Sequence, residues 1–207
     1  MEVKRLVLGM IRTNCYIAYT KDTKKAVIID PGADSKRIIQ EISALSVAPE
    51  AVLLTHGHFD HMLAADSLRK EYHIPVCILE EDAQLLEDAV KNCSAIFFRE
   101  YVTKADKLLK DGQILEFLDG NLKVIATQGH TMGSCCYYDK EEGILFSGDT
   151  LFQGSIGRTD LPTAKPSKIH SSIREKLFVL PEDTIVLTGH GEETTIGEEK
   201  ANNPYVC

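Results

Sequence analysis

The sequence predicts an α+β fold built from two sheet-containing halves that face each other. In the first half, short apolar runs alternate with amphipathic helical periodicity, as in βαβ units. In the second half, strand-like runs separated by glycine-containing turns dominate, and helical periodicity returns only near the end. No linker, low-complexity segment or block of charge divides the chain. A length of 207 residues suits one large domain, so we expect a single domain over residues 1–207.

The first half is predicted to open with an antiparallel meander, followed by alternating helices and strands. The predicted strands cover residues 5–8, 15–19, 26–29, 51–55 and 76–79. One predicted helix begins after residue 34, a second covers about residues 62–72, and a third covers about residues 82–90. Asp34 or Ser35 is expected to cap the first helix, because a short polar side chain there accepts hydrogen bonds from free backbone N–H groups.

The second half is predicted to be rich in short strands. These cover residues 114–118, 122–126, 135–138, 144–146 and 184–187. A helix bearing Ile169, Ile173 and Leu177 is expected to begin with Ser167 as its cap, and a last helical turn is expected at 196–201. Cys135 and Cys136 are adjacent on an alternating strand, so one side chain should face inward and the other outward.

Composition and charge narrow the class of protein. Hydrophobic residues make up 43% and charged residues 26%, which excludes a disordered, collagen-like or coiled-coil chain. The formal net charge of −8 opposes nonspecific binding to nucleic acid or to anionic membranes. No apolar run reaches the ~18 residues of a membrane span, and the N-terminus lacks the pattern of a secretory leader. We therefore expect a cytoplasmic protein.

Cysteine usage agrees with a reducing compartment. The six cysteines are widely scattered without a Cys-x-x-Cys spacing, and a chain of this size does not need disulfides to fold. We expect reduced thiols that mostly fill the core, with Cys207 at a frayed terminus.

A dense cluster of histidine and carboxylate side chains follows the predicted strand at 51–55. His56, His58, Asp60 and His61 lie within six positions at the end of that strand. A single buried histidine is commonly a hydrogen-bonded core residue, but these groups together point to a metal site. Imidazole nitrogen and carboxylate oxygen are ligands that borderline divalent cations prefer. Gly57 is expected to let the backbone curl so that the first two rings converge.

The remaining ligand candidates follow other predicted strands. His130, Asp149 and His190 come soon after the strands at 122–126, 144–146 and 184–187, and each is directly preceded by glycine. Loops at strand ends gather into sites, so we expect these side chains to meet the first cluster. The other two of the seven histidines, His73 and His170, lie on predicted helices outside such motifs. We expect them to be ordinary surface or core residues.

Four motifs, in this order, resemble those of the metallo-β-lactamase superfamily: His56-x-His58-x-Asp60-His61, Gly129-His130-Thr131, Ser147-Gly148-Asp149-Thr150 and Gly189-His190-Gly191. The wider context is similar to the hydroxyacylglutathione hydrolase (glyoxalase II)-like branch, in Gly157-Arg158-Thr159-Asp160 and in the segment from Thr194 to Tyr205. The resemblance implies a four-layer αβ/βα sandwich with a metal centre at one edge, between the two sheets. It also implies that residues 1–207 form a hydrolase domain.

The resemblance further implies roles for individual residues. His56, His58 and His130 would bind one metal ion, Asp60, His61 and His190 a second, and Asp149 would bridge the two. The cofactors would be two divalent cations, with Zn²⁺ as the first choice and iron or manganese as alternatives. Such a pair lowers the pKa of a shared water, so that a bridging hydroxide attacks a carbonyl carbon. Asp60 and Asp149 are the implied catalytic carboxylates.

The implied activity is hydrolysis of a small thioester. In the glyoxalase II type of reaction, S-2-hydroxyacylglutathione or a similar thiol ester gives a hydroxy acid and a thiol, and a thiolate leaves easily because thiols have a pKa of about 8.5. Asp30, at the end of an early strand, either orients a ligand imidazole or forms a simple turn. Arg158 either pairs with Asp160 beside the site or meets a substrate carboxylate.

Other superfamily members offer alternative functions. The main alternative is a persulfide dioxygenase, a mononuclear iron enzyme with nearly the same histidines and a similar Gly-x-Gly-Arg-Thr-Asp stretch. β-Lactamases are disfavoured, because they commonly carry cysteine or another residue where Asp149 stands and are exported. The net charge of −8 disfavours processing nucleases, and His58 disfavours diiron flavoproteins, which have glutamate there. A non-catalytic module that binds metal only to stabilise its fold is also disfavoured, because a structural site does not need a complete set of ligands that leaves the metal open to a substrate.

Two features separate this sequence from full-length glyoxalase II enzymes. Those enzymes continue into a C-terminal helical domain that supplies much of the glutathione site, whereas this sequence ends soon after His190. They also carry Lys-x-Tyr at the contact with the thiol carrier, where this sequence has Arg158-Thr159-Asp160. We therefore expect a more open substrate cleft and a thiol that need not be glutathione.

Overall fold

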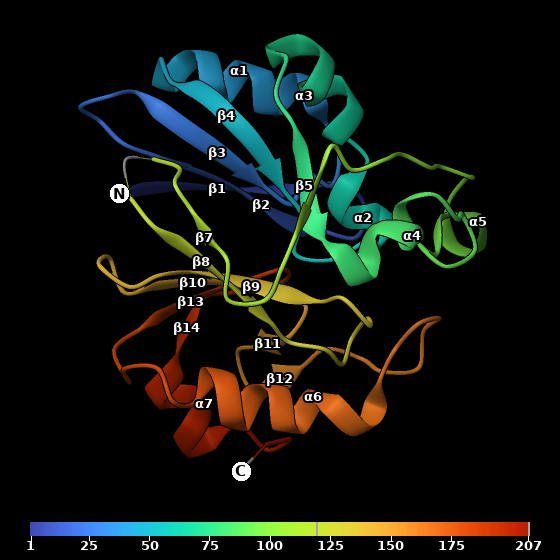
Figure 1. Cartoon of the computed structure of the whole chain (residues 1–207), viewed down its shortest axis with the longest axis vertical. Coiled ribbons are helices and arrows are strands. Elements are labelled where there is room, and N and C mark those ends of the chain that lie inside the picture. Colours follow the sequence, from blue (N-terminus) through green and yellow to red (C-terminus); the bar gives the residue numbers. More distant parts are fainter. Residues whose placement is uncertain (119, 207) are drawn as a thin grey trace.

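The computed structural model describes residues 1–118 and 120–206 and has four layers (Figure 1). Two six-stranded sheets pack face to face. Helices α1 (Ser35–Leu45) and α3 (Ala65–Tyr72) cover the outer face of the first sheet, and α6 (Pro166–Ser172) and α7 (Ile196–Asn202) cover that of the second. This αβ/βα sandwich confirms the predicted fold class.

The first sheet has the strand order β1-β2-β3-β4-β5-β6. Its strands are β1 (Glu2–Leu8), β2 (Thr13–Tyr19), β3 (Lys25–Ile29), β4 (Ala48–Leu53), β5 (Val76–Leu79) and β6 (Lys107–Leu109). The first three form the predicted antiparallel meander, and β3 to β6 run parallel. Parallel neighbours need crossover connections, which α1 and α3 provide. The carboxyl ends of β3, β4 and β5 therefore meet at one edge of the sheet.

The second sheet has the strand order β14-β13-β10-β9-β8-β7. Its strands are β7 (Ile114–Leu115), β8 (Leu122–Ala126), β9 (Cys135–Asp139), β10 (Ile144–Gly148), β13 (Ile185–Thr188) and β14 (Thr194–Thr195). Strands β10 and β13 run parallel, whereas the other neighbouring pairs run antiparallel. A separate hairpin of β11 (Leu151–Phe152) and β12 (Ser155–Ile156) follows β10.

Several helices are shorter than predicted. The helix expected at 62–72 is two helices, α2 (Phe59–Met62) and α3, and the one expected at 82–90 is a 3-10 turn at Glu80–Asp82 followed by α4 (Ala83–Leu86). Helix α5 (Ser94–Phe97), strand β6 and the β11–β12 hairpin were not predicted. Each of them is too short to show a hydrophobic period in the sequence.

The predicted helix caps were wrong in two cases. Asp34 precedes α1 in a left-handed conformation, and its side chain makes no capping hydrogen bond. Lys165, rather than Ser167, precedes α6, because Pro166 occupies the first helical position. Beyond Ser172 the chain continues as a π-helical turn at Ile173–Leu177. Thr195 caps α7 by accepting a hydrogen bond from the backbone N–H of Glu198.

Three apolar layers fill the sandwich. Ile28, Ile38 and Leu68 belong to the layer between the first sheet and its helices, and Tyr137 and Phe146 to the layer between the sheets. The third layer packs the second sheet against its own helices. Among the described residues, no helix combines the length and the apolar character that crossing a membrane requires.

The adjacent cysteines point to opposite faces of β9, as predicted, but both are fully buried. Cys135 lies between the sheets, and Cys136 lies under the helices of the second half. The expectation that one of them faces outward was wrong, because the fourth layer covers that face. The five described cysteines are free and buried, and Cys207 lies outside the described residues.

We expect Tyr137→Phe to lower the free energy of unfolding by about 1–2 kcal/mol, because Tyr137 donates a buried 2.7 Å hydrogen bond to the carbonyl of Leu54. Urea denaturation of the metal-loaded protein measures the change. Tyr205→Phe is the control, since Tyr205 is 56% exposed, and should change stability little. A loss for Tyr137→Phe no larger than that of the control would contradict the assigned bond.

Candidate metal centre

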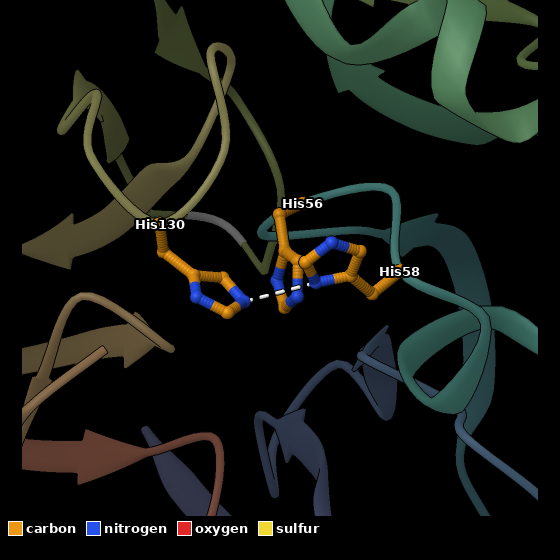
Figure 2. A group of neighbouring side chains, drawn as sticks. All are labelled: His56, His58 and His130. Atoms are coloured by element: carbon orange, nitrogen blue, oxygen red, sulfur yellow. Dashed lines mark hydrogen bonds between the residues drawn. The ribbon is translucent and has the colours of Figure 1, made fainter. Parts of the chain in front are cut away.

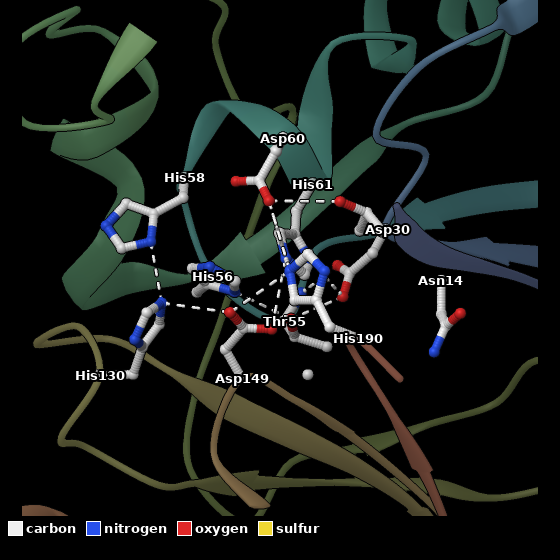
Figure 3. A network of polar contacts seen from close by, with 12 residues as sticks. Asn14, Asp30, Thr55, His56, His58, Asp60, His61, His130, Asp149 and His190 are labelled. Carbon is white, nitrogen blue, oxygen red and sulfur yellow. Dashed lines mark hydrogen bonds and ion pairs between the residues drawn. The ribbon is translucent and has the colours of Figure 1, made fainter. Parts of the chain in front are cut away.

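The ligand candidates gather where the two sheets meet at one edge. His56 lies in the loop after β4, His58 directly precedes α2, and Asp60 and His61 lie in the first turn of α2. His130, Asp149 and His190 follow β8, β10 and β13. Figure 3 shows these seven side chains converging from both halves of the molecule. The structure therefore brings together every ligand position that the sequence singled out.

The first group consists of His56, His58 and His130, all of them buried. One ring nitrogen from each lies within 4.8 Å of the others, and Figure 2 shows the three rings facing one another. The Nδ1 atom of His58 is 2.9 Å from Nε2 of His130. On the far side of its ring, Nδ1 of His130 lies 2.8 Å from the carbonyl oxygen of Arg158. A hydrogen bond to that carbonyl directs Nε2 of His130 toward the group.

The second group consists of Asp60, His61 and His190. Nε2 of His61 is 3.2 Å from Nε2 of His190, which is 3.4 Å from Oδ2 of Asp60. Behind His61, its Nδ1 atom lies 3.0 Å from Oδ2 of Asp30. Asp30 also accepts hydrogen bonds from the backbone N–H (2.8 Å) and hydroxyl (2.7 Å) of Thr55. This buried carboxylate thus contacts the imidazole from behind.

Asp149 lies between the two groups. Its Oδ1 is 3.4 Å from Nε2 of His61, and its Oδ2 is 3.6 Å from Nε2 of both His130 and His190. Asp149, His56 and His61 also form a third close group of donor atoms. A carboxylate placed in this way can contact two cations at once.

Burial and neighbouring charges divide the histidines into two kinds. Burial holds the pKa of His56 well below its usual value and lowers the pKa of His58 to about 3, assisted by the nearby His130. Burial also disfavours the charged form of His61, but Asp149, Asp60 and Asp30 outweigh it and raise the pKa of His61 well above its usual value. Asp149 and Asp60 raise the pKa of His190 against the effect of burial.

The donor set fits two divalent cations. Nε2 of His56 and Oδ1 of Asp149 are buried without a hydrogen-bond partner, and such atoms are costly unless a ligand satisfies them. Neutral imidazoles and carboxylates are the donors that Zn²⁺, Fe²⁺ and Mn²⁺ accept. The two groups could therefore each hold one metal ion, with Asp149 between them.

Two glycines of the motifs allow close packing rather than a special backbone conformation. A Cβ atom on Gly57 would lie 2.7 Å from Cβ of Leu85, and one on Gly189 would lie 2.2 Å from Oδ1 of Asp149. Neither glycine has a positive φ. The predicted role of Gly57 in curling the backbone was therefore wrong, since Gly57 instead lets α4 pack directly against the loop of His56 and His58.

Asp82 is an important residue that sequence reasoning missed. It is fully buried, and its carboxylate accepts hydrogen bonds from the N–H of Gly57 (3.0 Å), the hydroxyl of Thr131 (2.6 Å) and the N–H of Gly133 (2.6 Å). Through these hydrogen bonds, Asp82 connects the loop that carries His56 and His58 with the loop that carries His130. In the sequence it is the last residue of Glu80-Glu81-Asp82, a run that gives no sign of burial. Burial, partly offset by these bonds, raises the pKa of Asp82 to about 6.

A cavity of about 440 Å³ opens onto both groups. Its walls are largely apolar and include Ile11, Phe97 and Leu161, and Arg158 lies at its side. Arg158 forms a two-pronged ion pair with Asp160, with distances of 2.6 and 2.8 Å. The two alternatives for Arg158 are thus compatible, because an arginine paired at the surface also faces the cavity.

The two remaining histidines lie away from the centre. His73 ends α3 in a left-handed conformation, and His170 is exposed on α6. Neither belongs to a group of potential metal ligands among residues 1–118 and 120–206.

Comparison with known proteins agrees with this geometry. The family model described as the metallo-β-lactamase superfamily matches residues 8–190. The chain belongs to the metallo-β-lactamase superfamily. The probable metallo-hydrolase YqgX of Bacillus subtilis is 39% identical to it, over 100% of this chain and 98% of YqgX. Hydroxyacylglutathione hydrolase GloC of Haemophilus influenzae is 37% identical, over 100% of this chain and 98% of GloC.

Solved structures of superfamily members are also similar. The structure of BLEG-1, described as a B3 metallo-β-lactamase, has a TM-score of 0.95 and 42% identity over 99% of both chains. The structure of TTHA1623 in a di-iron-bound form has a TM-score of 0.86 and 34% identity, over 98% of this chain and 99% of TTHA1623. Together with the ligand set, these relatives identify a metallo-hydrolase of the superfamily with a histidine-rich site suited to two metal ions.

We expect metal binding near neutral pH to release at least about one proton, because His61 and His190 have raised pKa values and each must be unprotonated to act as a ligand. Competition by protons weakens as the pH rises through the raised pKa values, so affinity at the second group should increase with pH. His56 and His58, whose pKa values are lowered, should show no such competition near pH 7. Zn²⁺ calorimetry in two buffers of different ionisation enthalpy measures the release, and equal heats would contradict it.

We expect Asp82→Asn to weaken metal binding at the first group by about 10–100-fold, because an amide offers one acceptor oxygen where the carboxylate satisfies three donors. Zn²⁺ titration against a competing chelator measures the affinity. Asp22→Asn, at an exposed turn, is the matched control. An Asp82→Asn protein that binds both ions as tightly as this control would show that the bonds of Asp82 do not position the ligands.

Proposed function

We propose that this chain is a thioester hydrolase of the glyoxalase II type that uses two divalent cations, with Zn²⁺ as the first choice. The substrate would be S-2-hydroxyacylglutathione or a similar ester of a small thiol, in the cytoplasm, without a nucleic-acid or membrane partner. The observation that carries this proposal is the cavity, which opens onto both ligand groups and has few other polar side chains. The 37% identity to GloC, which is named a hydroxyacylglutathione hydrolase, supports it.

The polar side chains of the cavity favour a substrate whose leaving group needs no proton. Apart from the two ligand groups and Asp149, the cavity is lined by Cys93, Ser155 and Arg158 as polar side chains. Burial, together with nearby Asp60, raises the pKa of Cys93, so Cys93 is a poor proton donor. A thiolate needs no proton to depart near neutral pH, since thiols have a pKa of about 8.5. A thioester therefore suits a cavity without an evident general acid better than an amide does.

The protein side chains would contribute orientation and charge. Divalent cations, when bound, lower the pKa of a coordinated water and polarise a carbonyl group. Asp30 and the carbonyl of Arg158 hold the rings of His61 and His130 from behind. Asp60, which lines the cavity, is held in place by a 3.2 Å hydrogen bond that it accepts from the hydroxyl of Thr13. Arg158 offers a positive charge to the carboxylate of the thiol carrier, which is the proposed role of its cavity-facing position.

A second candidate function is β-lactam hydrolysis. The 42% identity and the TM-score of 0.95 to BLEG-1, described as a B3 metallo-β-lactamase, favour it. The same ligand groups and cavity would face a β-lactam carbonyl, although the amine that leaves requires a proton. Turnover of a chromogenic cephalosporin, compared with that of a thioester, distinguishes the two candidates.

We expect the Zn²⁺-reconstituted protein to hydrolyse S-lactoylglutathione with kcat/KM above about 10⁴ M⁻¹s⁻¹. His56→Ala and Asp149→Ala should each lower this value by more than about 100-fold and lower the metal content, because each removes a donor of the centre. His170→Ala is the control and should change neither.

The outcomes separate the candidates. Full turnover by an Asp149→Ala protein with unaltered metal content would refute the bridging role of Asp149. Absence of thioester turnover with two metals bound would refute the proposed function. In that case, anaerobic iron loading followed by oxygen uptake with glutathione persulfide would test the alternative of a persulfide dioxygenase.

A further inference from the structure

A smaller hollow adjoins the metal cavity. It has a volume of about 180 Å³ and lies between the β1–β2 loop, the segment just before α1, α2 and α5. Ile11, Phe59, Asp60 and Phe97 line both this hollow and the metal cavity. We call the hollow the side lobe. Because the two spaces share these four side chains, they are neighbours, and a chain that bends past the shared side chains can extend from the metal centre into the side lobe.

The side lobe is apolar. Leu8, Met10, Ala33, Leu63 and Phe98 form much of its wall. Among its lining residues, Asp60 is the charged one, and its Oδ2 is already directed at Thr13 and His190. The hydroxyl of Thr13 is engaged by Asp60. Apart from Asp60 and Thr13, the lining side chains are apolar or absent, so a hydroxyl or carboxylate group placed among them would lose its bonds to water without gaining a side-chain partner, and burying such a group is unfavourable.

The mouth of the side lobe carries large apolar side chains that are unusually exposed. Met10 is 85% exposed, Ile11 46%, Phe97 54% and Phe98 46%. The ring of Phe98 stacks on that of Phe59, with their centroids 6.1 Å apart. Exposed apolar side chains gathered at one place commonly mark a ligand-binding surface. Here they line a hollow that adjoins the metal cavity, so a substrate bound at the metal centre is the ligand best placed to cover them.

Size and polarity assign the two ends of a thioester to the two spaces. A dry apolar cavity of about 150 Å³ can hold benzene, so the side lobe, at about 180 Å³, has room for a chain of about six carbons. The larger cavity, at about 440 Å³, also has largely apolar walls, but it is the one that Arg158 lines, so a negatively charged group of the thiol carrier can meet Arg158 there. With the carbonyl carbon at the metal centre, the thiol then lies in the larger cavity and the acyl chain in the side lobe.

We infer that this enzyme prefers thioesters whose acyl group is an unsubstituted apolar chain of about four to eight carbons, bound in the side lobe. This inference rests on the proposed thioester hydrolysis and narrows its substrate class. Water adds to the carbonyl carbon and the C–S bond breaks, so that the products are a carboxylic acid and a thiol. Small hydroxyacyl groups such as lactoyl are then hydrolysed, but less efficiently than apolar chains.

The test compares a series of thioesters of one small thiol, N-acetylcysteamine, with the Zn²⁺-loaded protein. The acyl groups are acetyl, lactoyl, propionyl, butyryl, hexanoyl and octanoyl. Each methylene that becomes buried favours binding by about fourfold. We therefore expect kcat/KM for hexanoyl to exceed that for acetyl by at least about 30-fold, and we expect propionyl to exceed lactoyl.

Two further measurements address the side lobe itself. Ala33→Phe should lower the hexanoyl-to-acetyl ratio of kcat/KM by at least about tenfold, because the new ring fills the lobe. Ala44→Phe, on an exposed position of α1, is the matched control and should leave the ratio unchanged. If Ala33→Phe does not fold, inhibition of the wild type by the hexyl and methyl thioethers of N-acetylcysteamine replaces it, and the hexyl compound should bind at least about tenfold more tightly.

The outcomes distinguish this inference from the function on which it rests. Turnover that does not increase with chain length, or that is greatest for lactoyl, would overturn the side-lobe assignment and leave thioester hydrolysis intact. A length dependence that Ala33→Phe leaves unchanged would also overturn the assignment. Absence of turnover across the whole series with both metals bound would overturn the proposed function, and the inference with it.

Discussion

The direct contact between the two sheets at their loop edge is the constraint on which the rest of the structure depends. Backbone hydrogen bonds cross between the halves from Asn14 to Gly189 and from Cys135 to Thr55, each 2.8 Å long. Side chains strengthen this contact, since Asn14 and Tyr16 both donate to the carbonyl of Thr188, and Asp82 joins the loops of the first ligand group. Because ligands come from both halves, the metal centre can exist only while this edge is closed.

The centre concentrates groups that oppose folding when no metal is bound. Buried imidazoles and carboxylates lie within 4.8 Å of one another, and atoms such as Nε2 of His56 have no hydrogen-bond partner. Burying polar groups in this way is costly unless they are paired. Ligand binding to the folded state alone stabilises it, so metal ions and the apolar layers together account for a stable closed edge. The apolar side lobe beside this polar centre then gives the site a surface for an acyl chain.

Much of this arrangement was accessible from the sequence. Short apolar runs that are followed within a few residues by Gly-His or Gly-Asp predicted that His130, Asp149 and His190 lie in loops at strand ends. The acidic run that contains Asp82 gave no such signal, because its partners, Gly57 and Gly133, are brought to it by tertiary packing. Helix α5, which lines the side lobe, is four residues long and has no detectable period. The proline at the start of α6 overrode the capping signal of Ser167.

The geometry of the centre implies that both halves of the molecule jointly hold two metal ions with Asp149 between them. Anomalous diffraction from crystals of the metal-reconstituted protein tests it most directly. We expect two anomalous peaks separated by about 3.5–4 Å, as in two-metal hydrolytic sites. One should lie beside His56, His58 and His130 and the other beside Asp60, His61 and His190, with Asp149 contacting both. A single peak confined to one group, at saturating metal, would rule out a shared two-metal centre.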